Sequence, residues 1–288
     1  MLYLETPDTL KAVEHALQSI GRPAESIAWT YLVNVGDSES SLEQLRILKK
    51  ETGLQGDQLE RLLIWHACRQ SLPRVASLAV HQSVREKLDQ DLRQLPALRE
   101  TMMVGSYHFN RAAKMATLRR FPAGPMEWEL SGIPRSYFLK AAFPANLSFL
   151  AFVAFRLGAR SPCFFMHVAP NPRQRALSVP GQVLRAYYRI ARSLQLQPNV
   201  RALVAHAWFH DPRAVRDYPH LEVLSQPYLK EGGMIVLLGT APPSSGVLEG
   251  NAQRKAEYVA GRIQYRYGLA MWPRDAAIRW AEAHPELE

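Results

Sequence analysis

The sequence predicts an α/β protein with a mixed α+β sheet and a helical subdomain in front of it. Residues 163–239 alternate strand, helix, strand, helix and strand, an order typical of α/β folds. The first hundred residues carry apolar side chains at helical spacing. We therefore predict a helical N-terminal subdomain over residues 1–98 and an α/β domain over residues 99–288.

Four helices are predicted in the N-terminal subdomain. The first lies between Pro7 and Gly21, the second ends at Gly53, and the third begins at Asp57. A fourth is predicted over residues 75–92, where Val and Leu recur at helical intervals.

Short strands are predicted after this subdomain. Residues 101–109, 126–132 and 148–157 are strand-like runs separated by Gly and Pro. In the last run, alternate residues from Phe149 share one face, and the turn beginning at Gly158 is expected to form a hairpin. These runs predict a mainly antiparallel sheet.

The sheet is expected to continue into the alternating segment. Its elements are a strand over 163–170, a loop over 171–182, a helix over 183–197, a strand over 200–210, a helical stretch ending at 227–233, and a strand over 234–240. A polar helix over 253–261, a strand over 267–272 and a helix starting at Pro273 complete the chain. The loop and the following helix N-terminus lie where α/β proteins bind anionic ligands.

The composition limits the class of protein. With 288 residues, 47% of them hydrophobic, the chain can bury a large core, which excludes a disordered chain. Cys68 and Cys163 are too few for a disulfide framework or a Cys-based zinc site, and we interpret both as buried thiols.

Neither the N-terminal segment nor the most apolar window of the sequence predicts a membrane protein. The N-terminus lacks the pattern of a secretory signal, so we expect a cytoplasmic protein. The most apolar window, residues 141–157, is shorter than the roughly 20 residues of a membrane span, so we expect no transmembrane segment.

The net charge of +9 suggests an acidic partner. A nucleotide cofactor, an acyl carrier protein, nucleic acid and anionic lipid all fit this charge. Nucleic acid is the less favoured partner, because the arginines do not form an obvious patch.

The order of elements and one turn resemble a known family. Antiparallel strands, then strand, loop, helix, diverging strand, helix and a final strand pair is the layout of the GNAT-type N-acyltransferases. The sequence PYLKEGG at 227–233 resembles the tyrosine turn of those enzymes. The resemblance implies that Tyr228 is the general acid that protonates the coenzyme A thiolate, with Gly232 allowing the tight turn. Packing of Tyr228 at a helix end is the alternative.

The resemblance also implies a cofactor loop. Arg173, Arg175, Gly181 and Gln182 lie where the family binds the pyrophosphate of a coenzyme A thioester. The family loop carries more glycine than this one, which has Gly181 alone, beside Pro180. Two interpretations of Arg173 and Arg175 remain open: they contact an anion, or they are simply exposed to solvent.

His206 is the candidate general base for an amine acceptor, because histidine titrates near neutral pH. The alternative is a core histidine bonded to a carbonyl group. On an extended strand His206 and His210 would stand about 13 Å apart, so we predict no metal site. Asp211 and Pro212 are expected to cap a helix.

We therefore predict an acyltransferase that moves an acyl group from a thioester to an amine acceptor. The partners would be a small-molecule acyl donor and acceptor, with an acidic acyl carrier protein as a further candidate donor. The alternative is a non-catalytic basic module that keeps the GNAT-like sheet and contacts nucleic acid, anionic lipid or a protein partner.

Overall fold

A computed structural model describes most of the C-terminal two thirds of the chain and part of the remainder. The described residues are 32, 49–50, 53, 57–95, 102–103, 106–140, 145–158, 161–169, 179–240 and 252–288. The chain divides into two compact units, Met1–Leu78 with Gln82–Phe121, and Ala79–His81 with Pro122–Glu288. The first predicted helix, and the second up to residue 48, lie outside the described residues.

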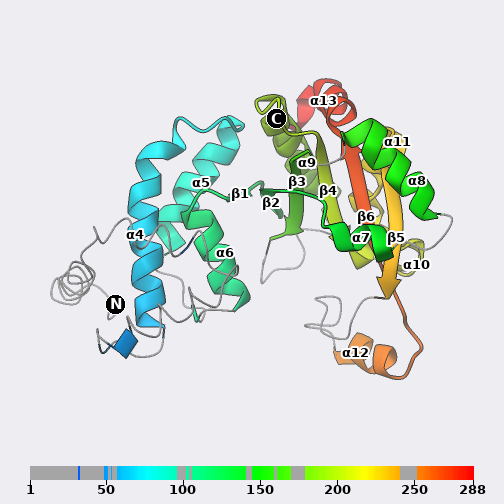
Figure 1. The fold of residues 1–288 in the computed structure, drawn as a ribbon, viewed down its shortest axis with the longest axis horizontal. Coiled ribbons are helices and arrows are strands. Elements are labelled where there is room, and N and C mark those ends of the chain that lie inside the picture. The colour runs from blue at the N-terminus through cyan, green and yellow to red at the C-terminus, as the bar shows by residue number, and fades with distance from the viewer. Residues whose placement is uncertain are drawn as a thin grey trace. The chain divides into compact units, whose positions relative to one another are not determined.

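The first unit contains three described helices, α4 (Gln58–Val75), α5 (Gln82–Gln94) and α6 (Tyr107–Ala116) (Figure 1). The third predicted helix is α4, which begins after Asp57 as expected. In α5, Val84, Leu88 and Leu92 are fully buried at intervals of four residues, which places them on one face of the helix.

Two predictions in this region are wrong. The helix expected over 75–92 is interrupted before Gln82, because the backbone there bonds elsewhere: the His81 N–H donates to Ser193 Oγ at 3.0 Å. The strand expected over 101–109 is replaced from Tyr107 onward by α6. Ser106 starts this helix, since its side chain accepts a hydrogen bond from the Phe109 N–H at 3.1 Å.

The second unit is built on a mixed β-sheet. Its strands are β2 (Met126–Ser131), β3 (Cys163–Val168), β4 (Ala202–Ala207), β5 (Met234–Thr240) and β6 (Arg266–Pro273). The short strand β1 (Arg120–Pro122) spans the boundary between the two units, and the sheet order is β1-β2-β3-β4-β6-β5. β3 and β4 are parallel, whereas β2–β3, β4–β6 and β5–β6 are antiparallel. The predicted fold class, an α/β protein with a mixed sheet, is confirmed.

Helices and short helical turns connect the strands. They are α7 (Arg135–Lys140), α8 (Ala145–Phe152), the π-helical turn η2 (Val153–Leu157), α9 (Pro180–Gln195), the 3-10 turn η4 (Trp208–His210), α10 (Pro212–Asp217), the 3-10 turn η5 (Pro219–Leu224), α11 (Gln226–Lys230), α12 (Ala252–Val259), α13 (Arg274–Glu282) and the 3-10 turn η6 (Pro285–Leu287). The succession from β3 through α9, β4 and α11 to the β5–β6 pair is the order that the sequence predicted.

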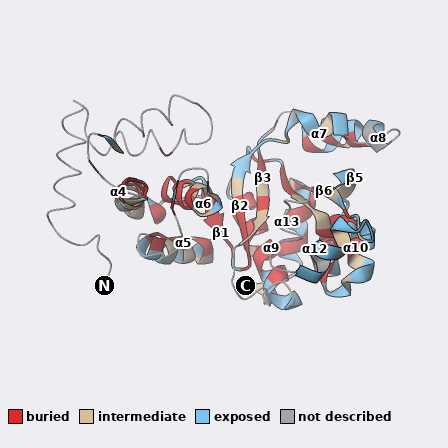
Figure 2. Cartoon of the chain, turned by 90° about the horizontal axis from the view of Figure 1, so that it is seen from below, coloured by how far each residue is buried: buried red, intermediate tan, exposed pale blue. Residues whose placement is uncertain are grey.

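The helices cover both faces of the sheet (Figure 2). α7 and α8 lie on one face, which we call the α8 face, and α9 and α13 lie on the other, which we call the α9 face. Successive strand residues point to opposite faces, so the two sets of side chains are distinct. Val204 and His206 of β4 therefore face α8, whereas Leu203 and Ala205 face α9.

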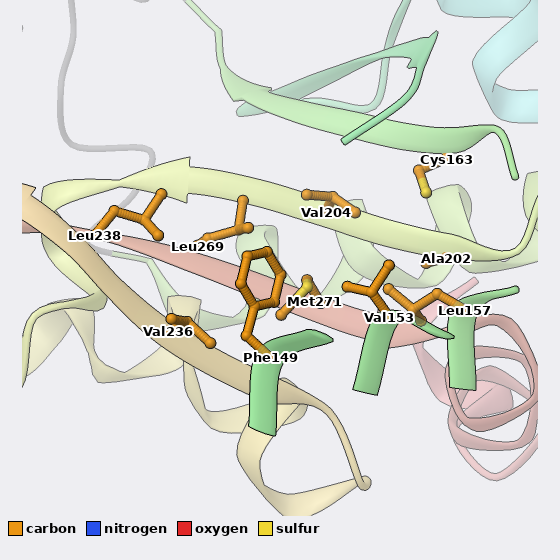
Figure 3. Close-up of a cluster of buried hydrophobic side chains, with 10 residues drawn as sticks. All are labelled: Phe149, Val153, Leu157, Cys163, Ala202, Val204, Val236, Leu238, Leu269 and Met271. Atoms are coloured by element: carbon orange, nitrogen blue, oxygen red, sulfur yellow. The ribbon is translucent and has the colours of Figure 1, made fainter. Parts of the chain in front are cut away.

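The segment 148–157 is helical, and the prediction of a strand with a hairpin turn there is wrong. Phe149, Val153 and Leu157 are buried at intervals of four residues and point onto the sheet, against Val204 and Met271 (Figure 3). Because nearly every residue of this segment is apolar, a period of two fits the sequence as well as a helical period. Gly158 ends the helical turn with a left-handed φ of 75°.

The strand predicted over 200–210 is shorter than expected. β4 ends at Ala207, and residues 208–210 form a 3-10 turn, so His210 does not continue the face of His206. The prediction that Asp211 caps a helix is confirmed, because its side chain accepts from the Arg213 N–H at 3.0 Å and Pro212 opens α10.

Two further predictions concern Cys residues and membrane spans. Cys68 and Cys163 are both free and buried, as predicted, and burial raises the pKa of each thiol to about 12. Among the helices that the structure describes, none has both the length and the apolar character needed to cross a membrane.

Candidate functional site

The two parallel strands at the centre of the sheet separate at their C-terminal ends. β3 and β4 pair from Phe164 to Met166 on one strand, and from Leu203 to Ala205 on the other. Beyond this point each strand stays paired with its outer neighbour, since His167 opposes Glu127 of β2 and His206 opposes Leu269 of β6. His167 and His206 therefore lie on the two strand ends just beyond the last paired residues, and we call the place between these ends the gap.

His206 borders this gap on the α8 face. The Tyr137 hydroxyl of α7 lies 3.2 Å from its Nδ1 atom. The imidazole also contacts the rings of Tyr137 and Tyr267, with centroids 4.7 and 4.5 Å away. These contacts fix the ring position through a residue that is 69 positions distant in the chain.

The environment of His206 keeps its imidazole neutral at neutral pH. Burial and, to a smaller extent, the positive charge of Lys140 together lower its pKa to about 4. A neutral imidazole has one nitrogen available to accept a proton. If the Nδ1–H donates to Tyr137, that nitrogen is Nε2, and His206 is then equipped to act as a base.

His167 is the second histidine on the α8 face. It belongs to β3, and its Nε2 atom lies 3.4 Å from Glu129 Oε1 of the neighbouring strand β2. Its side chain retains partial exposure. Glu129, His167 and His206 thus border the gap on the α8 face of the sheet.

Tyr228 lies on the opposite, α9 face. It is fully buried in α11, and its hydroxyl donates to the Met166 sulfur at 3.9 Å. Met166 is the last β3 residue paired with β4, so the phenol reaches the point where the strands begin to separate. The rings of Tyr187 and Trp272 enclose Tyr228, with centroids 5.8 and 5.5 Å away.

Burial raises the pKa of Tyr228 well above 10, and the neighbouring Tyr187 hydroxyl raises it further. The phenol therefore keeps its proton at neutral pH.

The tight turn after Tyr228 requires glycine at two positions. Gly232 has a φ of 72°, and a Cβ atom on Gly233 would lie 2.7 Å from the Tyr228 carbonyl oxygen.

The structure does not place His206 and Tyr228 side by side. They point to opposite faces of the sheet, on either side of the strand separation. A group held between the strand ends could meet one residue from each face.

Sequence reasoning missed a buried pair on the α9 face. His210 Nδ1 lies 2.8 Å from Ser225 Oγ, and the His210 ring contacts that of Tyr228 at a centroid distance of 5.8 Å. Burial lowers the pKa of His210 to about 3. Gly268 permits this packing, since a Cβ there would lie 2.5 Å from His210 Cβ. No local pattern joins His210 to Ser225, which lies 15 residues away in the chain.

The N-terminus of α9 holds two of the predicted cofactor residues. Gly181 and Gln182 are exposed in the first turn, and Val179 before them provides no side-chain cap. The first turn also carries no acidic residue. Pro180 has no N–H, and the Gln182 N–H donates to the Val179 carbonyl at 3.0 Å, so among the first helical residues Gly181 has the N–H for which no acceptor is described. Arg173 and Arg175 lie outside the described residues.

The segment of the sequence that supplies much of the site contains no Asp or Glu. Residues 130–210 contain ten Lys and Arg and no Asp or Glu, whereas the rest of the chain has 25 Lys and Arg against 26 Asp and Glu. The net positive charge of the protein is thus carried by the segment that forms α7, α8, β3, α9 and β4. A search for arginine clusters overlooks this pattern, because its signal is the missing negative charge.

No group of three or more His, Cys, Asp or Glu side chains suited to a metal ion occurs within the described ranges. His206 and His210 point into different environments, one beside Tyr137 and the other beside Ser225.

Comparisons with known proteins give only distant structural likeness. No protein-family model and no curated protein sequence matches the chain significantly. A solved acyltransferase in complex with decanoyl-CoA aligns over 91% of this chain and 86% of its own, with 14% identity and a TM-score of 0.49. An acyltransferase in complex with CoA and 10C-teicoplanin aligns over 92% of this chain and 87% of its own, with 14% identity and a TM-score of 0.41.

Proposed function

We propose that the protein is an acyltransferase that moves an acyl group from a coenzyme A thioester to an amine acceptor. The observation that carries this proposal is that the pairing of β3 and β4 ends at Met166 and Ala205, where Tyr228 contacts Met166 from one face and His206 follows Ala205 on the other. A thioester carbonyl held in this gap would be accessible from both faces.

The two faces offer the two proton transfers that the reaction needs. The amine nitrogen attacks the thioester carbonyl carbon, and the carbon–sulfur bond breaks as the new carbon–nitrogen bond is completed. His206 is unprotonated at neutral pH and would accept the proton that the amine nitrogen loses. Its low pKa makes it a weak base, so it would act after carbon–nitrogen bond formation has made that proton acidic. Tyr228, which keeps its proton at neutral pH, would donate to the departing thiolate.

The charge around the gap supports an anionic donor. In the first turn of α9, the Gly181 N–H and the exposed Gln182 side chain are suited to phosphate oxygens at the positive end of the helix dipole. Arg173 and Arg175 precede this turn in the sequence, and we propose that they contribute to the same anion site. The stretch 130–210 contributes ten Lys and Arg and no carboxylate, which reduces the repulsion that a polyanionic donor would meet, although Glu129 lies beside His167.

Titration calorimetry of the full chain with acetyl-CoA tests the donor. We expect saturable binding, and competition by coenzyme A. An absence of heat with acetyl-CoA would overturn the proposal, and salt-sensitive DNA binding in its place would favour the non-catalytic basic module.

Substitution of Tyr228 tests the mechanism. Tyr228→Phe should lower kcat by about a hundredfold or more, because the leaving thiolate loses its proton donor. Affinity for acetyl-CoA should stay within roughly twofold, since the ring and its packing remain. Tyr188→Phe is the matched control, a buried tyrosine of α9 that contacts His81 instead. An unchanged kcat in Tyr228→Phe would remove the proposed role of this residue.

A further inference from the structure

The second unit exposes an apolar surface on α7, α8 and η2. Leu139 is 90% exposed, Leu147 57%, Leu150 45% and Phe155 87%. Leu139 and Phe155 are the two most exposed large hydrophobic residues in the described part of the chain. We call these four side chains the outer apolar surface. Such a gathering of exposed apolar residues is typical of an interaction site.

The outer apolar surface is held in a fixed orientation. α8 and η2 form a continuous rod of residues 145–157, about 20 Å long at 1.5 Å per residue. Phe149, Val153 and Leu157 anchor its inner side on the sheet (Figure 3). Leu147, Leu150 and Phe155 consequently point away from the sheet along the opposite side of the rod. These exposed apolar side chains therefore lie on the part of the rod that the sheet does not cover.

The charges beside this surface are positive. Residues 130–162 include Arg135, Lys140, Arg156 and Arg160, with no Asp or Glu. Lys140 adjoins Leu139 in the sequence and is exposed, and Arg156 adjoins Phe155. For Lys140 and Arg156, the two of these side chains that the structure describes, the one acidic partner is Asp275 of α13, whose carboxylate lies 3.9 Å from the half-exposed Arg156. An ion pair that long and that exposed contributes little, so Arg156 remains able to contact another anion.

We propose that the outer apolar surface docks on an anionic lipid bilayer. Helices that lie in the membrane interface place apolar side chains among the acyl chains, while neighbouring Lys and Arg contact the phosphates. The rod lies flat on the sheet, so Leu147, Leu150 and Phe155 could enter a planar interface together. A protein partner or a second copy would also cover apolar side chains, but the basic and carboxylate-free surroundings favour a negatively charged surface.

This docking would bring the bilayer to the α8 face of the sheet. Tyr137 of α7 contacts His206, so the docked helix pair would also adjoin the candidate base. The proposal does not depend on acyl transfer, because vesicle binding and acetyl-CoA binding are separate measurements.

Vesicle co-sedimentation of the full chain tests the proposal. We expect binding to vesicles of phosphatidylcholine with phosphatidylglycerol, and much weaker binding to vesicles of phosphatidylcholine alone. The combined variant Leu139→Gln, Leu147→Gln and Phe155→Gln should lose about tenfold or more of this binding. Its circular dichroism and unfolding temperature should match the wild type, since the three side chains are exposed.

The matched control carries the same kind of change elsewhere, as Leu196→Gln, Leu229→Gln and Val259→Gln, three exposed apolar residues outside α7, α8 and η2. It should bind vesicles like the wild type. The proposal is overturned by a wild type that binds neither vesicle, or by equal losses in both variants. A concentration-dependent dimer that the first variant abolishes, without vesicle binding by the wild type, would instead assign the surface to self-association.

Discussion

At the scale of single residues, the candidate site depends on how burial and neighbouring charges set two proton affinities in opposite directions. Burial lowers the pKa of the His206 imidazole to about 4 and raises the pKa of the Tyr228 phenol well above 10. Both groups are consequently neutral at neutral pH. The first can accept a proton and the second can donate one, but both pKa values lie away from neutral pH, where proton transfer is most effective.

Lys140 provides a test of the base through pH dependence. Activity should be level at neutral pH and fall below about pH 4, where His206 becomes protonated. Lys140→Gln removes a positive charge that disfavours this protonation, so the pKa should rise and the acid limb of kcat/KM should move to higher pH. We expect kcat/KM at pH 4 to fall on the order of twofold, since an exposed charge acts weakly.

The pH profile of Lys230→Gln serves as the control, because Lys230 is an exposed residue of α11 on the other face. A pH profile of Lys140→Gln identical to that of the wild type would argue against His206 as the titrating base.

The residues that sequence analysis proposed were those with a motif or a titratable group. Tyr228 could be chosen because it lies in the turn that resembles a family motif, and His206 because it is a titratable residue on a predicted strand. Their partners could not, since Tyr137 is 69 positions from His206 and Met166 is 62 positions from Tyr228. Such contacts depend on the strand register, which local patterns do not specify.

At the scale of elements, the prediction was right for α9, where the apolar residues fit only a helical period. It was wrong for residues 148–157, where they fit both a helix and a strand. The helix α9 was found because its buried residues, such as Val183, Tyr187 and Leu194, repeat along one face, whereas its other face is polar. Residues 148–157 satisfy both a strand and a helix, since almost all are apolar. Their inner face became identifiable only when Phe149, Val153 and Leu157 were placed on the sheet.

The end of β4 shows the same difficulty in another form. Trp208 and Phe209 continue the apolar character of the strand, so the sequence extends it to His210. The chain turns earlier because the η4 backbone packs against Gly268 of β6, where only a hydrogen atom fits beside His210. A packing constraint from a strand 58 positions later has no local signature.

Gly268 therefore gives a test of this packing. Gly268→Ala would place its Cβ 2.5 Å from His210 Cβ and 3.2 Å from the His210 carbonyl carbon. Because these atoms are close to the backbone, they cannot simply rotate away, and we expect a loss of about 2–3 kcal/mol in the free energy of unfolding. Urea unfolding measures this change.

Gly239→Ala on the adjacent strand β5 is the matched variant, since a Cβ there meets nothing within 4 Å. We expect it to change the free energy of unfolding by no more than about 0.5 kcal/mol. Equal effects of the two substitutions would contradict the close approach at His210.

At the scale of the whole molecule, charge is distributed by segment. The central elements from α7 to β4 carry the positive excess, and the remainder of the sequence is close to neutral. An electrostatic field of this kind raises the local concentration of anions around one region of the surface. Its influence decreases as salt shortens the range of electrostatic attraction.

Salt should therefore discriminate between two acyl donors. We expect the affinity for acetyl-CoA to fall roughly tenfold as the salt concentration rises from about 0.05 M to about 0.5 M. Acetyl-pantetheine, which has the same thioester and no phosphate, should bind more weakly and with little dependence on salt. Calorimetry at several salt concentrations provides both values. A parallel decline for the two donors would show that phosphate contacts do not contribute.

The separation of β3 and β4 also has a consequence for the backbone itself. A sheet normally has two edges, at its outermost strands, but strands that part in the middle create two more. Beyond Met166 and Ala205 the facing peptide groups no longer pair with each other, and each N–H or C=O turned into the gap requires another partner. A slender chain with its own amides, lying between the strands, would restore the missing hydrogen bonds and close the sheet. The proposed donor would meet this requirement, because the extended arm of coenzyme A carries amide groups of its own.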